Sequence, residues 1–442
     1  MINKKIDIVT LGCSKNDIDS ELMYSILKSN GFTIADTLEE AEVIIVNTCG
    51  FIESAKEESI NAIWEMTRYK EEGDCEFLIL AGCLAQRYSE ELMDEIPEID
   101  AIVGTGNIKN IAHTIRELES DYKKIRDIEN IDEDYLEDVK RVSFNTTEYV
   151  KISEGCDNFC TYCIIPNLRG RHRSRKMENI IEEVKHLADN GVKEVILIGQ
   201  NTSDYGIDLY GDYTLYKLLD KLNEIDKLEW IRLLYLYPDN FNTKLIDSIK
   251  NNEKVVNYVD IPLQHVSDNV LKKMNRKTNK KDIISLIENL RLSIPDIIIR
   301  TTFIVGFPGE TEDDFNQLYD FIREVKFERL GVFTYSKEED TPAYDMQGQV
   351  LEDIKEKRRD MIMAAQVDIS EDIMKNKVGK KYKVLIEEDN GNNNYTARSY
   401  MDSPDIDGVV YIDADKPLDI GSFIKVEISN YLEYDLIGEI IE

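Results

Sequence analysis

Three cysteines, Cys156, Cys160 and Cys163, lie within eight residues of one another. They follow a strand-like stretch at 149–153, so they share one short loop. Zinc sites usually collect four ligands, and this loop holds no fourth cysteine or histidine, although His172 follows nine residues after Cys163. A 4Fe-4S cluster held by three thiolates would instead leave one iron open to a substrate or cofactor. The spacing therefore favours such a cluster, with zinc as the alternative.

Three further cysteines, Cys13, Cys49 and Cys83, are dispersed through the first hundred residues. Each lies at or just after the end of a strand-like stretch, at residues 5–11, 41–49 and 76–83. Helical stretches separate these strands, which predicts a parallel sheet with helices on its faces. Because sites form at the carboxyl ends of such strands, the three thiols are expected to converge. Any one of them alone could be a buried core cysteine, and Cys75 has no such position.

The elements that must position these cysteines form three blocks. After the first α/β block, residues 147–342 contain six strand-like stretches with helical stretches between most of them, which predicts a partial βα barrel. A long helix follows, and the last stretch has short alternating strands typical of a small antiparallel barrel. The expected boundaries are 1–121, a charged linker at 122–142, 143–375 and 376–442.

Composition limits the class of protein. Seven cysteines in 442 residues are an odd number and widely spread, which argues against a disulfide framework. The net charge of −33 argues against bulk electrostatic binding of nucleic acid, although an acidic proteome would give the same value. No apolar run reaches the about 18 residues of a membrane span, and the start lacks signal-peptide features. We therefore expect a cytoplasmic protein without a membrane partner.

The CxxxCxxC loop, the βα repeats and the segment "FIVGFPGE" (303–310) together resemble the radical S-adenosylmethionine (SAM) enzymes. In that superfamily the open iron is chelated by the amino and carboxylate groups of SAM. One electron from the cluster then cleaves SAM, and the resulting 5′-deoxyadenosyl radical abstracts a hydrogen atom. The cofactor carries this chemistry, while the protein supplies ligands, orientation and exclusion of solvent.

The resemblance also implies residues that bind SAM or line its cavity: Tyr162, Gly199, Gln200, Asn201, Gln264, His265, Gly306, Pro308 and Gly309. Tyr162 is expected over the adenine, and the segment 199–201 near the SAM amino group. An ordinary turn at 199–201 and a simply packed His265 are the alternatives. The basic run at 168–176 could be a solvated loop or bind phosphate, but its match to the superfamily loop implies a role in shaping the site. No catalytic side chain is implied beyond the ligands.

The order of the three blocks is similar to that of the methylthiotransferases, over nearly the whole chain. In that family the N-terminal cysteines hold a second 4Fe-4S cluster, and the last block is a TRAM domain. The free iron of the second cluster accepts a sulfur that is methylated and then inserted into a C–H bond. The resemblance thus implies two clusters, held by Cys13, Cys49 and Cys83 and by Cys156, Cys160 and Cys163.

Two branches of the family are possible. The segments "LGCSKNDIDSE" (11–21) and "ARSYMDSPDIDG" (397–408) resemble the branch that modifies an aspartate β-carbon of ribosomal protein S12. Residues 376–442 hold seven Lys or Arg against fourteen Asp or Glu, which suits a basic protein partner better than RNA. The expected partners are S12 and a low-potential electron donor such as flavodoxin or ferredoxin. The alternatives are a tRNA methylthiotransferase and a non-catalytic iron–sulfur or zinc RNA-binding assembly factor.

Overall fold

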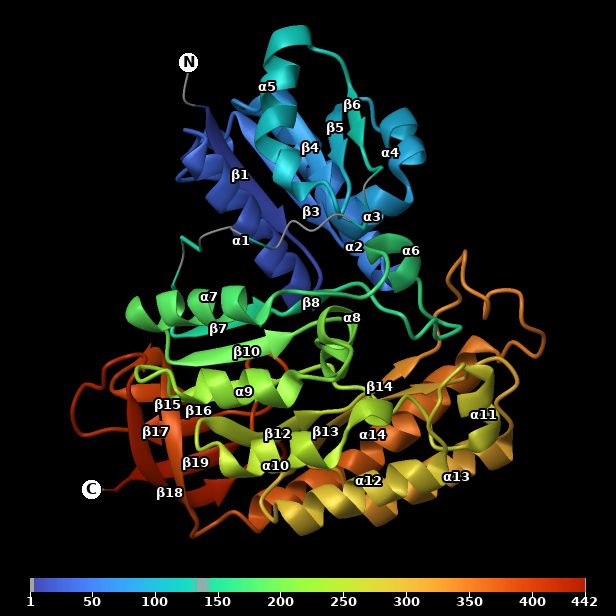
Figure 1. Ribbon diagram of the computed structural model, residues 1–442, viewed down its shortest axis with the longest axis vertical. Coiled ribbons are helices and arrows are strands. Elements are labelled where there is room, and N and C mark those ends of the chain that lie inside the picture. The colour runs from blue at the N-terminus through green and yellow to red at the C-terminus, as the bar shows by residue number, and fades with distance from the viewer. Residues whose placement is uncertain (1–3, 130, 133–136, 138–140, 143, 442) are drawn as a thin grey trace.

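The protein consists of three modules, which Figure 1 shows as an N-terminal α/β module, a central βα domain below it and a small barrel against the lower left of that domain. This computed structural model describes the chain except for residues 1–3, 130, 133–136, 138–140, 143 and 442. The predicted three-block α/β architecture is confirmed.

The N-terminal module is a six-stranded parallel sheet with the order β2-β1-β3-β4-β5-β6. Its elements are β1 (Lys5–Thr10), α1 (Ser14–Ser29), β2 (Thr33–Ile34), η1 (Leu38–Glu40), β3 (Val43–Thr48), α2 (Glu53–Glu72), β4 (Phe77–Ala81), α3 (Gly82–Arg87), α4 (Ser89–Glu95), β5 (Ile99–Val103), η2 (Ile108–Asn110), α5 (Ile111–Asp121) and β6 (Ile125–Asp127). Every residue of β3 and β4 is buried, as expected for strands covered by helices on both faces. β6 lies inside the segment expected as a linker.

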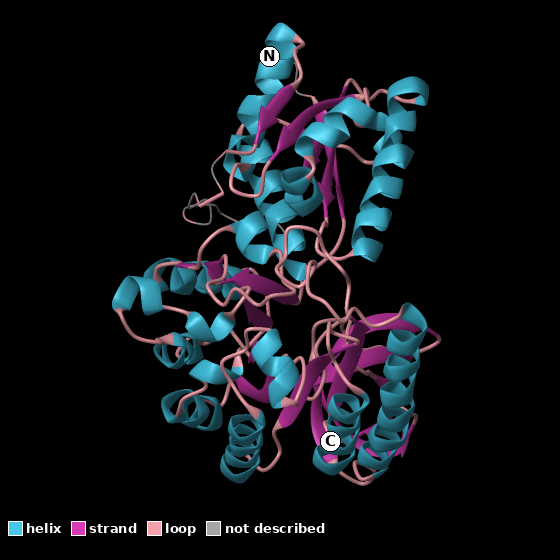
Figure 2. Ribbon diagram, turned by 90° about the vertical axis from the view of Figure 1, so that its right-hand side faces the viewer, coloured by secondary structure: helices cyan, strands magenta, loops and turns pink. Residues whose placement is uncertain are grey.

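The central domain contains six parallel strands in the order β7-β10-β11-β12-β13-β14. Its elements are β7 (Thr147–Lys151), β8 (Ser153–Glu154), α6 (Ile165–Arg169), β9 (Arg173–Ser174), α7 (Met177–Asp189), β10 (Glu194–Ile198), η3 (Thr202–Asp204), α8 (Ile207–Tyr210), α9 (Leu215–Asn223), β11 (Trp230–Leu233), η4 (Pro238–Asn240), α10 (Thr243–Asn251), β12 (Val255–Asp260), α11 (Asp268–Lys273), α12 (Lys280–Ser293), β13 (Ile298–Val305), α13 (Glu312–Val325), β14 (Arg329–Thr334) and α14 (Glu352–Lys375). β7 and β14 are not paired with each other, so the barrel is open, as Figure 2 shows.

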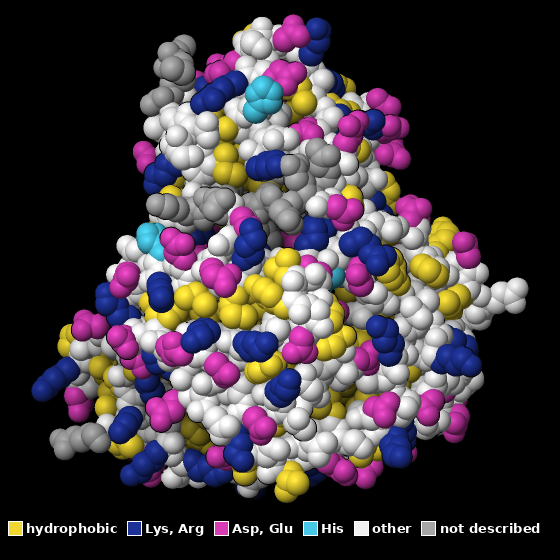
Figure 3. Space-filling model, in the orientation of Figure 1, with side chains coloured by type: hydrophobic (Ala, Val, Ile, Leu, Met, Phe, Trp, Pro, Cys, Tyr) yellow, Lys and Arg dark blue, Asp and Glu magenta, His cyan; other side chains and the backbone are white. Residues whose placement is uncertain are grey.

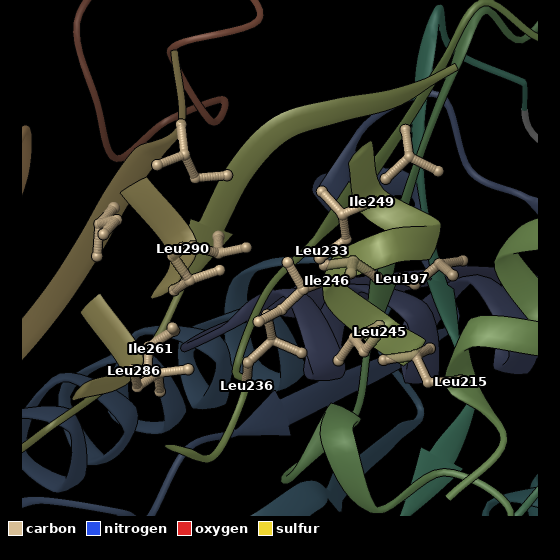
Figure 4. Close-up of a cluster of buried hydrophobic side chains, with 14 of the residues drawn as sticks. Leu197, Leu215, Leu233, Leu236, Leu245, Ile246, Ile249, Ile261, Leu286 and Leu290 are labelled. Carbon is tan, nitrogen blue, oxygen red and sulfur yellow. The ribbon is translucent and has the colours of Figure 1, made fainter. Parts of the chain in front are cut away.

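One apolar layer holds the strands of the central domain against its helices. Leu197 and Leu233 from the strands meet Leu245 and Ile249 of α10 and Leu290 of α12 in this layer (Figure 4). These side chains are almost fully removed from water. The hydrophobic effect of this burial fixes the sheet, and thereby the loops at its carboxyl end.

The C-terminal module is a closed five-stranded barrel with the order β15-β16-β17-β19-β18. Its strands are β15 (Lys381–Gly391), β16 (Asn394–Ser399), β17 (Val410–Asp413), β18 (Phe423–Tyr431) and β19 (Leu436–Ile440). The strand pairs are antiparallel except β17 with β19, which is parallel. Local alternation of residues predicts strands but not the direction in which they pair, which explains this difference from the expected antiparallel barrel.

Buried ion pairs attach the small barrel to the central domain. Arg398 of β16 pairs with Glu194 of β10, and Arg232 Nε of β11 donates to the same carboxylate at 2.8 Å. Tyr258 Oη of β12 donates to Asp407 Oδ2 at 2.6 Å. The loop at 400–409 thus lies against strands of the central sheet. None of the described helices is both long and apolar enough to cross a membrane.

Candidate active site

The three N-terminal cysteines meet at the carboxyl end of the first sheet. Cys13 precedes α1, Cys49 follows β3, and Cys83 lies in α3 directly after β4. A Cβ atom on Gly12, beside Cys13, would lie 3.0 Å from Cys49 Sγ. Similarly, a Cβ on Gly50, beside Cys49, would lie 3.1 Å from the carbonyl carbon of Cys83. The convergence expected from the strand order is therefore present, because Gly12 and Gly50 let the backbones approach closely.

Burial favours the protonated form of two of these thiols, Cys49 and Cys83. The pKa of Cys49 is raised to about 11, mainly by burial and to a smaller extent by the nearby Cys83 and Cys13 thiols. Burial likewise raises the pKa of Cys83, against the opposing charge of Arg169. A metal centre deprotonates such thiols by its own charge.

The CxxxCxxC loop lies at the carboxyl end of the central sheet, between β8 and α6. Two backbone hydrogen bonds close it, from Cys156 N to Gly170 O at 3.2 Å and from Cys163 N to Cys160 O at 3.0 Å. Phe159 has a positive φ of 48°, which turns the chain between the first two cysteines. Burial raises the pKa of Cys156 to about 11 and raises that of Cys163 as well.

All seven cysteines are free thiols, so both groups of three offer sulfur ligands for iron. Among the described residues, no three His, Cys, Asp or Glu side chains lie close enough together to hold a single metal ion. His172 hydrogen-bonds Ser174 Oγ at 3.1 Å instead of extending the cysteine set. Cys75 is buried near Phe77 O, as an incidental thiol would be.

Four buried polar atoms near the CxxxCxxC loop have no hydrogen-bond partner among the described residues: Ser153 Oγ, Gln200 Oε1, Asn201 Nδ2 and Gln264 Oε1. Buried polar atoms are seldom left unpaired, because desolvation costs free energy. Gln200 Nε2 donates to Glu154, just ahead of the loop, and Gln264 shares a cavity with Tyr162. This set of unpaired acceptors and donors fits a polar cofactor such as SAM.

That cavity has a volume of about 820 Å³ and lies between the first two modules. Phe51 and Ser54, just after Cys49, line one side. Tyr162, Gln264 and Thr302 line the central-domain side. Phe51 is two residues from Cys49 and Tyr162 lies within the CxxxCxxC loop, so the cavity lies next to both cysteine groups, although no cysteine is among its lining residues.

The glycine-rich turn after β13 is held by Glu310. Its Oε2 accepts hydrogen bonds from Gly306 N at 2.6 Å and Phe307 N at 3.1 Å, while Arg358 Nη1 donates to Oε1 at 2.9 Å. Gly306 and Gly309 both have positive φ, which glycine adopts without strain. Pro308 completes this buried turn.

The space beside the predicted cofactor-binding glycines is occupied by other side chains of the protein. A Cβ on Gly306 would meet Lys355, and one on Gly309 would meet Lys273, both within 2.4 Å. A Cβ on Gly199 would lie 2.4 Å from Ser153 Oγ. Asn201 Oδ1 caps η3 by accepting from Ser203 N at 3.2 Å. The methylenes of Lys355, the ammonium of Lys273 and the hydroxyl of Ser153 thus fill the space next to these glycines.

His265 is buried beside the cavity rather than lining it. Its Nδ1 accepts a hydrogen bond from Ser267 N at 2.9 Å, and burial lowers its pKa to about 3. The neighbouring Gln264 does line the cavity and has a positive φ of 71°. Both residues were expected to line the cavity. Gln264 does so, whereas His265 is packed in the interior.

The sequence did not reveal the link between the two cysteine groups, which is Arg169. Its Nη1 donates to Asp19 Oδ2 at 2.7 Å and its Nη2 to Asn16 Oδ1 at 2.7 Å. The same guanidinium lies near the Cys83 thiol, where its charge opposes the rise in the pKa of that thiol. Lys151 Nζ donates to Asp19 Oδ1 at 2.5 Å, so the carboxylate is shared by two cations. The only sequence signal was the position of Arg169 six residues after Cys163.

Comparisons with known proteins agree with this division. Residues 150–322 match the radical SAM superfamily, residues 378–441 match the TRAM domain, and residues 5–104 match the family described as Uncharacterized protein family UPF0004. The solved structure of the radical SAM methyltransferase TsrM from Kitasatospora setae, with cobalamin and a 4Fe-4S cluster bound, has a TM-score of 0.59 at 12% identity. The alignment covers 89% of this chain and 80% of that chain, which shows a similar fold.

Much closer relatives match from end to end. The ribosomal protein uS12 methylthiotransferase RimO of Clostridioides difficile (strain 630) is 51% identical over 439 residues, 99% of this chain and 99% of the relative. The protein of the same name from Thermoanaerobacter sp. (strain X514) is 50% identical over 440 residues, 99% of this chain and 100% of the relative. Fold, cysteine loop and domain matches define a radical SAM enzyme, which uses an iron–sulfur cluster and SAM. The chain belongs to the ribosomal protein uS12 methylthiotransferase family, RimO.

Proposed function

We propose that this methylthiotransferase replaces a hydrogen on the β-carbon of an aspartate in ribosomal protein uS12 by a methylthio group. The observation that carries the proposal is the about 50% identity, over the whole chain, to relatives named for uS12. The segments 11–21 and 397–408, which resemble the protein-modifying branch, support it further. On the face in Figure 3, Asp and Glu are interspersed with Lys and Arg, as for a protein that does not bind RNA by bulk charge.

Cys156, Cys160 and Cys163 would hold one 4Fe-4S cluster together with SAM, and Cys13, Cys49 and Cys83 would hold a second. When bound, these groups supply the radical that removes hydrogen and the sulfur that is transferred. The protein's own residues orient the reactants and exclude water. The unpaired Gln200, Asn201 and Gln264 atoms offer hydrogen bonds to SAM, and Arg169 fixes one cysteine group relative to the other.

The setting of the reaction is also part of the proposal. Reduction of the cluster needs a low-potential donor such as flavodoxin or ferredoxin, because iron–sulfur clusters of this type have strongly negative potentials. uS12 is made and assembled in the cytoplasm, so the enzyme is expected there. A membrane partner and a direct tRNA substrate are not part of this proposal.

The test is intact-mass analysis of uS12 from cells that lack this gene. The expected result is the absence of a mass increment of about 46 Da, the difference between SCH3 and H. Re-expression of the chain should restore the increment, whereas a Cys163→Ala variant should not. An unchanged uS12 mass with loss of a methylthiolated tRNA base would contradict the proposal in favour of the tRNA-modifying branch. No change in either would favour a non-catalytic assembly factor.

A further inference from the structure

Lys15 differs from the other buried lysines of the described chain. Lys4, Lys56, Lys151 and Lys355 each pair with a carboxylate at 2.5–2.9 Å. Lys15 is equally buried, with 8% of its surface exposed, yet no carboxylate among the described residues lies within ion-pair distance of it. Its ammonium contacts the Tyr235 ring, with Nζ 3.2 Å from the ring centroid. The ring face attracts the cation, and no described residue accepts a hydrogen bond from the ammonium. Lys15 Nζ is not among the fully buried atoms without a partner, so water still reaches it.

The position of Lys15 favours binding of an anion. Lys15 lies in the first turn of α1, where the helix dipole presents its positive end. Asp19 pairs with Lys151, whereas no carboxylate among the described residues pairs with Lys15. An anion that binds next to Lys15 would therefore meet both the ammonium and the positive end of the helix.

Lys15 lies at the seam between the two cysteine groups. It follows Cys13 by two residues, and Ser14 Oγ lies 3.5 Å from Tyr235 Oη. Tyr235 follows β11, and two residues later Tyr237 Oη lies 3.9 Å from Cys160 Sγ. Tyr235 holds its place with a positive φ of 59° and a hydrogen bond from its N–H to Asp260 Oδ2 at 2.9 Å. Asp260 itself is paired with Arg300, so it does not neutralise Lys15.

We propose that Lys15 binds the side-chain carboxylate of the substrate aspartate and so selects aspartate over uncharged residues. This assignment rests on the proposed function. The carboxylate is bonded directly to the β-carbon, so an ion pair with Lys15 would place that carbon between the two cysteine groups. Lys15 would then supply the charge that distinguishes an acidic target from its amide.

The test uses the reconstituted full-length enzyme with SAM and two forms of uS12, one with the target aspartate and one with asparagine in its place. The dissociation constants and initial rates are measured for the wild type, Lys15→Met and Lys15→Arg. The wild type should bind the aspartate form at least about tenfold more tightly. Lys15→Met should bind both forms equally, because methionine keeps the bulk of lysine but not its charge. Lys15→Arg should keep part of the preference.

Two controls separate recognition from structure. Lys15→Met should contain as much iron as the wild type and should unfold at nearly the same temperature, since it removes one cation–π contact and no ion pair. If Lys15→Met keeps the preference for aspartate, or loses affinity for both forms equally, the assignment is wrong. If the wild type adds no methylthio group to uS12, the proposed function itself fails and the assignment with it. If Lys15→Met does not fold, loss of the preference in Lys15→Gln decides the question.

Discussion

Arg169 of the central domain donates a hydrogen bond of 2.7 Å to Asp19 of the N-terminal module, 150 residues earlier in the chain. Both side chains are almost completely buried, and Glu154 and Lys151 share the same network. Since Arg169 also lies near the Cys83 thiol, one guanidinium links the loop of the second cysteine group to a ligand candidate of the first. These buried ion pairs, together with apolar packing, therefore fix the distance between the two cysteine groups.

Replacing Arg169 by methionine should destabilise the protein by about 3–5 kcal/mol, because the buried Asp19 and Glu154 carboxylates would lose one of the two cations that they share, Arg169 and Lys151. Chemical denaturation of the variant measures this loss. The control is Arg171→Met in the same loop, whose ion pair with Asp157 is exposed and contributes only about 0–1 kcal/mol. Equal stability of the two variants would show that the buried network does not hold the modules together.

Each single variant of a ligand cysteine should lose one of two iron–sulfur clusters and keep the other. Anaerobically reconstituted wild type should hold about eight irons, and Cys83→Ala or Cys163→Ala about four each. Cys83→Ala should still cleave SAM reductively without forming product, whereas Cys163→Ala should release no 5′-deoxyadenosine. Cys75→Ala is the matched control and should keep all the iron, because its thiol lies near Phe77 O, away from both groups. Four irons in the wild type, or stoichiometric zinc, would refute the two-cluster proposal.

Glu310 should make stability fall as the pH rises. Burial raises its pKa to about 7, although Arg358 and the N–H groups of Phe307 and Gly306 oppose this. The folded state therefore binds this proton more tightly than the unfolded state. The resulting stabilisation is complete below about pH 4.5 and is lost as the pH rises through about 7. Thermal unfolding across this range should show wild type losing stability relative to Glu310→Gln; a constant difference would contradict the assignment.

The small barrel should loosen when its buried anchor is removed. Arg398→Met leaves Glu194 with Arg232 alone and leaves Glu387 unpaired. Hydrogen exchange of the strands at 381–440 should accelerate as a result. Lys383→Met is the control, because its pair with Glu229 spans the same interface but is exposed on both sides. Similar exchange in both variants would show that apolar contacts alone attach the barrel.

The sequence allowed the βα alternation and the strand-end positions of both cysteine groups to be predicted, because a strand end and a cysteine are both local features. The order of the strands within each sheet was not predicted. The burial of Arg169 could not be predicted in this way. The run 168–176 contains four arginines that differ in burial without a regular pattern, and the partners of Arg169 at residues 16 and 19 are distant in sequence. Similarly, β6 is only three residues long, two of them charged, so it carries no periodic signal within a charged segment. Lys15 is part of the segment 11–21 that resembles the protein-modifying branch, but a sequence alone does not show which carboxylates lie near it.

The loop at 400–409 also limits how this protein can be rebuilt. Asp402 pairs with Arg329, Asp407 accepts from Tyr258, and the Tyr400 carbonyl accepts from Arg232 at 2.9 Å. These contacts depend on particular residues of the central sheet, so the C-terminal module cannot simply be replaced by that of another protein. A chimera that takes this module from a distant relative must also take matching residues at positions 232, 258 and 329. Without these matching residues, the chimera would have buried charged groups without partners between the central sheet and the C-terminal module.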